Sequence, residues 1–441
     1  MTFRNFFFFS FLIFSAAANA QDREYAKKVI DTLASPSMHG RGYVANGDKI
    51  AAEYISDQYR SFGLTSFNLT GTYLQKFGFP VNTFPGKVEM TFTFADGEKK
   101  VCQPGEHFLV SSNSPSVKGH FKIVMLDSAI VYNETKLAAF KKLNLKKAFL
   151  LVDTIGVRTL TELAFLSNYI KYPVGVKGIL VPVKPNPMAD NCFKLTPWDF
   201  SQYQSTIPVI QVEYAYRAVT EIDICIGAKF FKKYNSQNVI GYIRGKVNPD
   251  SFIVFTAHYD HLGQMGKTVY FPGANDNASG VAMLLSLARY YSQPGNKPNC
   301  SIVFMAFGGE EVGLLGSHYY VEHPLFPMGR IKFLTNMDIL GTGDEGITVV
   351  NATVFEPEFK KLQELNQAGN YLPLLKPRGK AAISDHHFFT EKNIPSFYIY
   401  TLGGIKAYHD TCDRSETLPL TKFEELFSLL REFTDWVDGN K

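Results

Sequence analysis

Acidic and histidine side chains recur at the points where apolar runs of this sequence end. They are His258, Asp260, Asp276, Glu310, Glu311, Asp338 and His409. Imidazole and carboxylate groups bind divalent metals and also transfer protons. Carboxylates crowded into one pocket repel one another and would take up protons unless a cation lay between them. The sequence therefore predicts a metal site that also contains a catalytic base.

The types of ligand predict which metal this site holds. Mixed histidine and carboxylate ligands without a thiolate suit zinc in a catalytic site that keeps one position open for water. Six of these groups, Asp260 left aside, already exceed what one tetrahedral zinc accepts, so we expect two ions that share a carboxylate, with another carboxylate left as a base. Four further histidines have no comparable strand-end setting and are expected on the surface or in packing: His261, His318, His323 and His387.

A repeated order of strand, loop and helix from residue 238 onward must position these side chains. Strands are predicted at 239–244, 252–257, 301–307, 331–337 and 396–401, and helices at 279–291, 311–322, 356–368 and 422–437. Nearly continuous apolar strands indicate burial on both faces, which predicts an α/β fold with a mixed, mostly parallel sheet between helices. In such sheets ligands bind at the carboxyl ends of the strands, where the acidic and histidine side chains fall.

The part of the chain before residue 238 has a different pattern of predicted helices and strands. Two helices are predicted within 25–64, the second over 48–62, and a β-hairpin follows with its first strand at 88–94. Short strands at 122–126, 148–152, 178–183 and 207–212, with a helix at 135–143, predict a smaller inserted α/β domain without a metal cluster. The predicted division is a signal peptide at 1–20, an N-terminal part of the catalytic domain at 21–83, the insertion at 84–233 and the catalytic domain at 234–441.

Composition and the first residues restrict the class of protein. The chain has 441 residues with 45 basic and 41 acidic side chains and no long run of one charge, which excludes an electrostatic nucleic-acid binder. Arg4, an apolar run at 6–14 and a small-residue site ending at Ala20 are typical of a cleavable signal peptide. The run is too short to span a membrane, so we expect export to the periplasm or the extracellular space without stable membrane insertion.

The cysteines are too few and too scattered to form a disulfide scaffold. They are Cys102, Cys192, Cys225, Cys300 and Cys412. At least one must remain unpaired within the chain, and an oxidising compartment permits a bridge, for example from Cys102 or Cys192 to Cys225.

The motifs around the candidate ligands resemble those of the co-catalytic di-zinc aminopeptidases related to bacterial leucyl aminopeptidase and glutamate carboxypeptidase, a zinc peptidase family that also includes glutaminyl cyclases. The matching segments are Ala257-His258-Tyr259-Asp260, 273–280, Phe307-Gly308-Gly309-Glu310-Glu311, Asn336-Met337-Asp338 and Ser384-Asp385-His386, closed by His409. Gly40-Arg41-Gly42 and the helix that follows are also similar to the family, so the resemblance covers most of the chain. It implies a zinc-exopeptidase fold.

The resemblance also implies a role for each residue. Asp276 would bridge two zinc ions. Glu311 and His409 would complete one zinc site, and His258 and Asp338 the other. Glu310 would be the general base, Asp260 would orient His258, and Asp385 would play a similar supporting part. The implied activity is that of an exported aminopeptidase, which hydrolyses the N-terminal residue of peptides with a zinc-activated hydroxide.

Two further features bear on this resemblance. Residues 84–233 are similar to the protease-associated domain that is often inserted in this family, and this domain would flank the cleft. Ala381 stands where bacterial leucyl aminopeptidase has a tyrosine that is a candidate for stabilising the oxyanion, so that stabilisation must come from zinc or another donor.

Two other functions remain open from the ligands alone. A glutaminyl cyclase would use the same ligand pattern with a single zinc, although the tryptophans that surround the pocket of such cyclases have no counterpart here, because the two tryptophans of this chain, Trp198 and Trp436, lie far from the motifs. A non-catalytic peptide-binding relative would have lost zinc ligands, whereas this chain retains the full set and Glu310.

Overall fold

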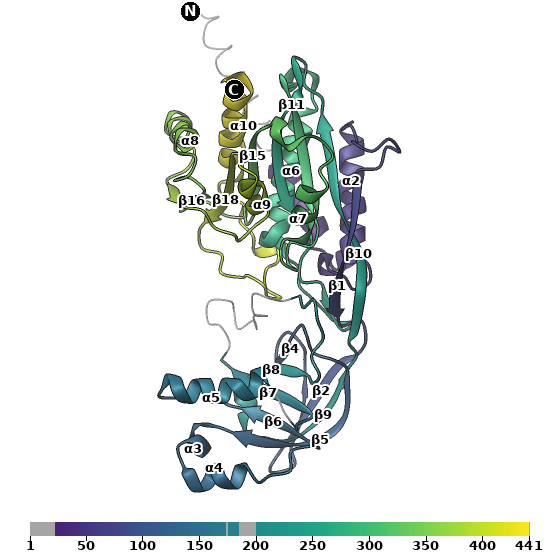
Figure 1. The fold of residues 1–441 in the computed structure, drawn as a ribbon, viewed down its shortest axis with the longest axis vertical. Helices are drawn as coiled ribbons and strands as arrows, with labels where there is room; N and C mark the ends of the chain where they lie inside the picture. The colour runs from purple at the N-terminus through teal and green to yellow at the C-terminus, as the bar shows by residue number, and fades with distance from the viewer. Residues whose placement is uncertain (1–22, 173–174, 185–199, 441) are drawn as a thin grey trace, which may run out of the picture.

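The computed structural model describes residues 23–172, 175–184 and 200–440, and the predicted signal peptide lies outside these residues. Two eight-stranded sheets dominate the described chain, and they lie one above the other along the long axis of the molecule (Figure 1). A small two-stranded sheet, β12 (Gln264–Met265) and β13 (Val269–Tyr270), accompanies them. None of the helices in the described part of the chain has the length and apolar character needed to cross a membrane.

The first sheet contains the strands that carry the candidate ligands. Its order is β1 (Leu74–Thr83), β10 (Lys229–Ile243), β14 (Cys300–Phe307), β11 (Asn248–His258), β15 (Ile331–Met337), β18 (Ser396–Leu402), β16 (Gly346–Val350) and β17 (Leu375–Arg378). The four central strands β14, β11, β15 and β18 are mutually parallel. Strands β1 and β10 pair antiparallel with their neighbours, and β16 pairs antiparallel with β18 but parallel with β17. The predicted mixed sheet with a parallel centre is therefore confirmed.

Helices cover both faces of this sheet, because its central strands are buried on both sides. Alternate residues of β11 divide between two hydrophobic clusters: Ile253 and Phe255 belong to one, and Val254 to the other. The first cluster includes side chains of α2 (Gly47–Ser61), α6 (Gly280–Tyr291) and α10 (Phe423–Asn440). The second includes Tyr320 of α7 (Leu315–Glu322) and Phe389 of α9 (His386–Glu391). Alternation along a strand thus explains why apolar residues occur at consecutive positions.

Two further helices also contribute side chains to the first cluster. An additional helix covers residues 23–33, and a 3-10 segment, η1 (Pro36–Arg41), leads from it toward α2. Helix α8 (Glu356–Gly369) contributes Phe359 and Leu362 to the first cluster and contacts α10.

The second sheet is formed entirely by residues between β1 and β10. Its order is β3 (Lys99–Cys102), β2 (Val88–Phe94), β9 (Val219–Ile226), β5 (Val117–Leu126), β6 (Ala148–Val152), β7 (Gly178–Val183), β8 (Val209–Glu213) and β4 (Phe108–Val110). Three helices, α3 (Ser128–Val131), α4 (Glu134–Phe140) and α5 (Leu160–Lys171), pack on it. The long pair β1 and β10 runs from the first sheet toward this second part (Figure 1).

Three expectations from the sequence differ from the structure. The helix predicted from residue 311 begins instead at Leu315, because residues 311–314 form a turn in which the amides of Gly313 and Leu314 donate to the carbonyl of Glu310. Strand β10 begins ten residues before the predicted position 239, because its first half pairs with β1, which the sequence did not predict. The suggested disulfide to Cys225 is wrong, because Cys225 is a free thiol.

The other cysteines complete that correction. Cys102 and Cys300 are also free thiols, whereas Cys412 is disulfide-bonded. Cys192 lies outside the described residues.

Candidate metal centre

Three parallel strands bring the first group of candidate ligands together. His258 is the last residue of β11, Glu310 and Glu311 follow β14 by a short turn, and Asp338 directly follows β15. The register places His258 opposite Phe307, the last residue of β14. The carboxyl ends of the three strands are therefore level, and their loops meet at one edge of the sheet.

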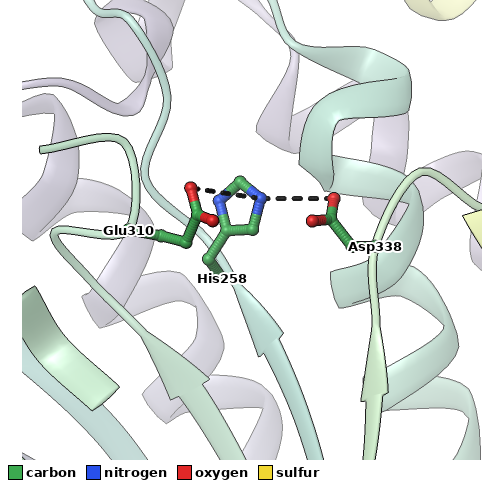
Figure 2. A group of neighbouring side chains, drawn as sticks. All are labelled: His258, Glu310 and Asp338. Carbon is green, nitrogen blue, oxygen red and sulfur yellow. Dashed lines mark hydrogen bonds and ion pairs between the residues drawn. The ribbon is translucent and has the colours of Figure 1, made fainter. Parts of the chain in front are cut away.

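His258 lies between carboxylates from different strands. Its Nε2 is 3.3 Å from Oδ1 of Asp338, 3.3 Å from Oδ1 of Asp276 and 4.0 Å from Oε2 of Glu310. Figure 2 shows Glu310 and Asp338 on either side of the His258 ring. Burial opposes the charge on His258, but Glu310 and Asp338 raise its pKa well above the ordinary value.

His409 forms a second group with the same aspartate. Its Nε2 is 3.1 Å from Oδ2 of Asp276 and 3.2 Å from Oε2 of Glu311. Asp276 therefore contacts the two histidines through different oxygens, an arrangement that allows its carboxylate to bridge two sites. Burial favours the neutral acid, but hydrogen bonds from His258 and His409 hold the pKa of Asp276 well below its usual range.

The six side chains have the chemistry and the burial of a divalent metal site. Ligand atoms of His258, Glu310 and Asp338 lie within 4.8 Å of one another, as do those of His258, Asp276 and Glu311. In the described part of the chain these carboxylates form ion pairs with histidines only, with no lysine or arginine among their partners. Four buried carboxylates with so little compensating charge fit divalent cations.

Glu310 is the member of the site whose carboxyl is hardest to ionise. Burial raises its pKa well above the ordinary value, and although His258 lowers it, the charges of Asp385 and Glu311 raise it further. Glu311, the next residue, has a pKa lowered to about 2 because the charge of His409 and the hydrogen bonds from His261 and His409 outweigh its burial and the charge of Asp276. The pKa values of the two neighbouring glutamates are therefore shifted in opposite directions.

Asp260 supports the two glutamates by accepting their amides. Its Oδ1 accepts from the backbone N–H of Glu310 at 3.1 Å and its Oδ2 from that of Glu311 at 3.4 Å, and the hydroxyl of Tyr43 donates to Oδ2 at 2.7 Å. Nδ1 of His258 lies 3.2 Å from the backbone carbonyl of Asp260 and 3.9 Å from its carboxylate. The structure thus places Asp260 beside His258 and adds contacts to Glu310 and Glu311 that the sequence did not indicate, and the orienting role of Asp260 remains a prediction.

Two buried side chains fix the loop that carries Asp276. The carboxylate of Asp413 accepts from the backbone N–H groups of Asn275 and Asp276 at 2.8 and 2.9 Å. The guanidinium of Arg41 donates to the carbonyls of Gly273 and Asp276 from the other side. For Arg41, the sequence signal was its position in the segment Gly40-Arg41-Gly42. For Asp413, the available signal in the sequence was its position four residues after His409.

The Ser384-Asp385-His386 segment also reaches the site. The hydroxyl of Ser384 donates to Oδ2 of Asp338 at 3.1 Å. No role was assigned to Ser384 from the sequence, so this contact with a candidate ligand was not predicted. Asp385 is fully buried next to it, and burial raises its pKa to about 7. The supporting part expected of Asp385 remains a prediction.

His261 corrects the expectation of a surface or packing histidine. It is completely buried, and its Nδ1 lies 2.6 Å from Oε1 of Glu311. Its spacing of three residues from His258, in the same strand-end loop, was the available signal. His318 and His323 contact aromatic rings, Phe388 and Tyr319, as packing residues do.

Known proteins resemble this chain in sequence and in fold. Residues 238–434 match the model of "Peptidase family M28". The aminopeptidase YwaD of Bacillus subtilis is 34% identical over 174 residues, which cover 38% of this chain and 33% of that protein. A probable zinc metalloprotease of Leptosphaeria maculans is 37% identical over 113 residues, 25% of this chain and 26% of that protein. The chain thus spans about a third or less of the length of these curated relatives.

Solved structures share the fold over most of the chain. BSAP, a zinc aminopeptidase from Bacillus subtilis, has a TM-score of 0.62 with 21% identity over 93% of this chain and 94% of that one. A peptidase M28 precursor from Shewanella amazonensis has a TM-score of 0.62 with 15% identity over 96% of this chain and 97% of that one. The matched residues 238–434 contain all six candidate ligands. Residues 238–434 therefore form a domain of the peptidase M28 type, and the predicted resemblance to the zinc peptidases is confirmed for this part of the chain.

Proposed function

We propose that this protein is a zinc-dependent aminopeptidase that removes the N-terminal residue from peptides. The observation that carries the proposal is the group of two buried histidines and four carboxylates at the carboxyl ends of parallel strands and in the loops beside them, with Asp276 between the histidines. Relatives named aminopeptidase and zinc metalloprotease support it. Peptides are the proposed substrates.

The residues around Asp276 would hold two zinc ions. Asp276 would bridge them, with His258 and Asp338 on one side and His409 and Glu311 on the other, because each histidine lies about as far from its second carboxylate as from Asp276. Zinc, when bound, lowers the pKa of water and polarises a substrate carbonyl.

Glu310 would be the general base. Its carboxylate lies 4.0 Å from Nε2 of His258, farther than the 3.3 Å of Asp276 and Asp338, so Glu310 is the carboxylate left over when the others bind metal. A raised pKa suits a group that takes a proton from water and returns it to the departing amine. The carboxylate of Asp260 accepts hydrogen bonds from the backbone N–H groups of Glu310 and Glu311, and these bonds fix the backbone from which both side chains extend.

We also propose the setting of this activity. Residues 84–233 would form the protease-associated-like domain between the two parts of the catalytic domain, and residues 1–20 would direct export to the periplasm or the extracellular space. The position of the second sheet between β1 and β10 supports the first of these assignments.

The test combines metal analysis with hydrolysis of aminoacyl chromogenic substrates. We expect two zinc ions per chain and expect Glu310→Gln to lower kcat at least about 100-fold, because an isosteric amide cannot accept the proton. Glu53→Gln, an equal change on the exposed face of α2, is the matched control and should leave kcat unchanged.

Two results would contradict the proposal. One zinc per chain with cyclisation of N-terminal glutamine and no hydrolysis would identify a glutaminyl cyclase instead. No bound metal and no hydrolysis would indicate a non-catalytic relative.

A further inference from the structure

One buried histidine beside the metal centre has no part in the proposed function. His261 lies in the loop after β11, and its side chain is completely buried against a candidate ligand, Glu311. The distance from Nδ1 of His261 to Oε1 of Glu311 is 2.6 Å. Because a carboxylate can only accept, Nδ1 carries the hydrogen and donates it.

This contact engages one oxygen of Glu311 and leaves the other on the metal side. Oε2 lies 3.2 Å from Nε2 of His409, and the same nitrogen contacts Asp276 at 3.1 Å. The carboxylate of Glu311 is therefore held between two imidazoles, with one oxygen toward each. Fixing Oε1 stops the carboxylate from rotating about its terminal bond, which has a broad preference of its own.

The surrounding backbone holds the ring of His261 in place. A Cβ atom built on Gly273 would lie only 2.4 Å from Cδ2 of the ring, so glycine at this position allows the ring to lie against the loop that carries Asp276. The backbone N–H of His261 donates to the carbonyl of Arg41 at 3.3 Å. The ring also meets that of His409 edge-on, with centroids 5.7 Å apart.

The other ring nitrogen makes no competing hydrogen bond. Nε2 of His261 is buried and has no hydrogen-bond partner among the described residues. Among these residues, the contact to Glu311 is thus the one hydrogen bond of the ring.

We propose that His261 is a positioning residue that orients Glu311 as a metal ligand through its Nδ1–H group. The inference rests on the proposed zinc site and adds a member to it. Hydrogen-bond partners of metal ligands typically change metal affinity by 10- to 100-fold when they are removed.

Two amide substitutions at this position separate the hydrogen bond from the volume of the ring. In His261→Asn the amide nitrogen is two bonds from Cβ, as Nδ1 is in histidine, whereas in His261→Gln it is three bonds away. Zinc affinity is measured by competition with a chelator, and the stability of the metal-free protein by thermal unfolding in excess chelator. We expect His261→Gln to weaken one zinc site about 10- to 100-fold and His261→Asn to weaken it less than about 5-fold, with both metal-free proteins folded.

The matched control is His39→Gln. His39 lies near the same loop and also bonds through Nδ1, but to Oε1 of Gln264 at 2.8 Å, so the same change should leave zinc affinity unaltered. Equal affinities in wild type and His261→Gln, equal weakening in His261→Asn and His261→Gln, or weakening that only follows lost stability of the metal-free protein would each overturn the inference. A wild-type protein that binds no zinc would overturn the proposed function as well, which distinguishes the two failures.

Discussion

Asp48, at the start of α2, is a buried carboxylate outside the metal centre. Its Oδ1 accepts from the hydroxyl of Tyr234 and its Oδ2 from that of Ser236 at 2.9 Å. Burial nevertheless raises its pKa to about 6. The folded protein therefore holds this proton more tightly than the unfolded chain, in which aspartate has its ordinary pKa.

The raised pKa of Asp48 should make the unfolding free energy depend on pH. Between about pH 4 and pH 6 the folded state binds the proton of Asp48 and the unfolded state does not, so its contribution to stability falls as pH rises through this window and is lost above it. As pH rises through this window, the unfolding free energy of wild type should fall by on the order of 2–3 kcal/mol relative to that of Asp48→Asn, which has no proton to lose. Urea unfolding of both proteins at pH 4 and pH 7.5 measures the difference. A difference that does not change with pH would contradict the assignment.

Single residues also mark where sequence reasoning succeeded and where it failed. The six candidate side chains were predicted because each lies at the end of an apolar strand or in a loop beside one, and the structure brings all six together. His261 was misjudged because its role depends on a turn that brings Glu311 back toward it. Ser384 and Tyr43 likewise act through contacts between distant segments, which spacing along the chain does not reveal.

At the scale of elements, the segment η1 locks the loops of the metal centre together. The guanidinium of Arg41, at its end, is completely buried and donates only to backbone carbonyls. Those carbonyls belong to Leu33, Tyr259, Pro272, Gly273 and Asp276. One side chain thus connects the N-terminal helix, the loop after β11 and the loop before α6.

Replacing this guanidinium should loosen all three segments. Arg41→Lys keeps the charge but cannot reach carbonyls on several sides, and each buried carbonyl left without a donor costs about 1–3 kcal/mol. We expect a loss of on the order of 3 kcal/mol or more in unfolding free energy, measured by urea unfolding followed by circular dichroism. Arg60→Lys, which makes the same change at an exposed arginine of α2, should cost less than about 0.5 kcal/mol. Equal stabilities of the two variants would refute this role.

The elements themselves were predicted unequally, for a physical reason. Strands β11, β14, β15 and β18 were found within one or a few residues because burial on both faces gives them unbroken apolar runs. The first half of β10 and its partner β1 were missed, because they run toward the second sheet and lack the unbroken buried apolar runs of the central strands. Register between distant strands is set by pairing, and pairing leaves little trace in either strand alone.

At the scale of the whole molecule, the metal centre joins separate parts of one domain. Its ligands come from the ends of β11, β14 and β15 and from the loops around Asp276 and His409. Bound zinc should therefore stabilise the fold, by about 2.7 kcal/mol for a ligand present at 100 times its Kd.

Removal of metal should reveal that linkage. We expect excess chelator to lower the Tm of wild type and of Glu310→Gln alike, because Glu310 is the base and not a ligand in the proposed site. Asp338→Asn, which weakens a ligand, should show a smaller shift between the zinc-loaded and chelated states. Differential scanning calorimetry measures the shifts, and a wild-type Tm that does not respond to chelator would contradict the linkage.

The order of the ligands along the chain also has a consequence for biogenesis. His258 comes first and His409 last, and the strands that align them, from β11 to β18, lie in the interval between. A growing chain that has not yet passed β18 can offer only scattered side chains to a metal ion. For the exported zinc enzyme proposed above, metal capture would then wait until this domain has been synthesised and folded, so the compartment in which folding finishes, and not the one in which translation begins, would supply the zinc. Chains truncated before β18 should bind zinc no better than an unstructured peptide of the same composition.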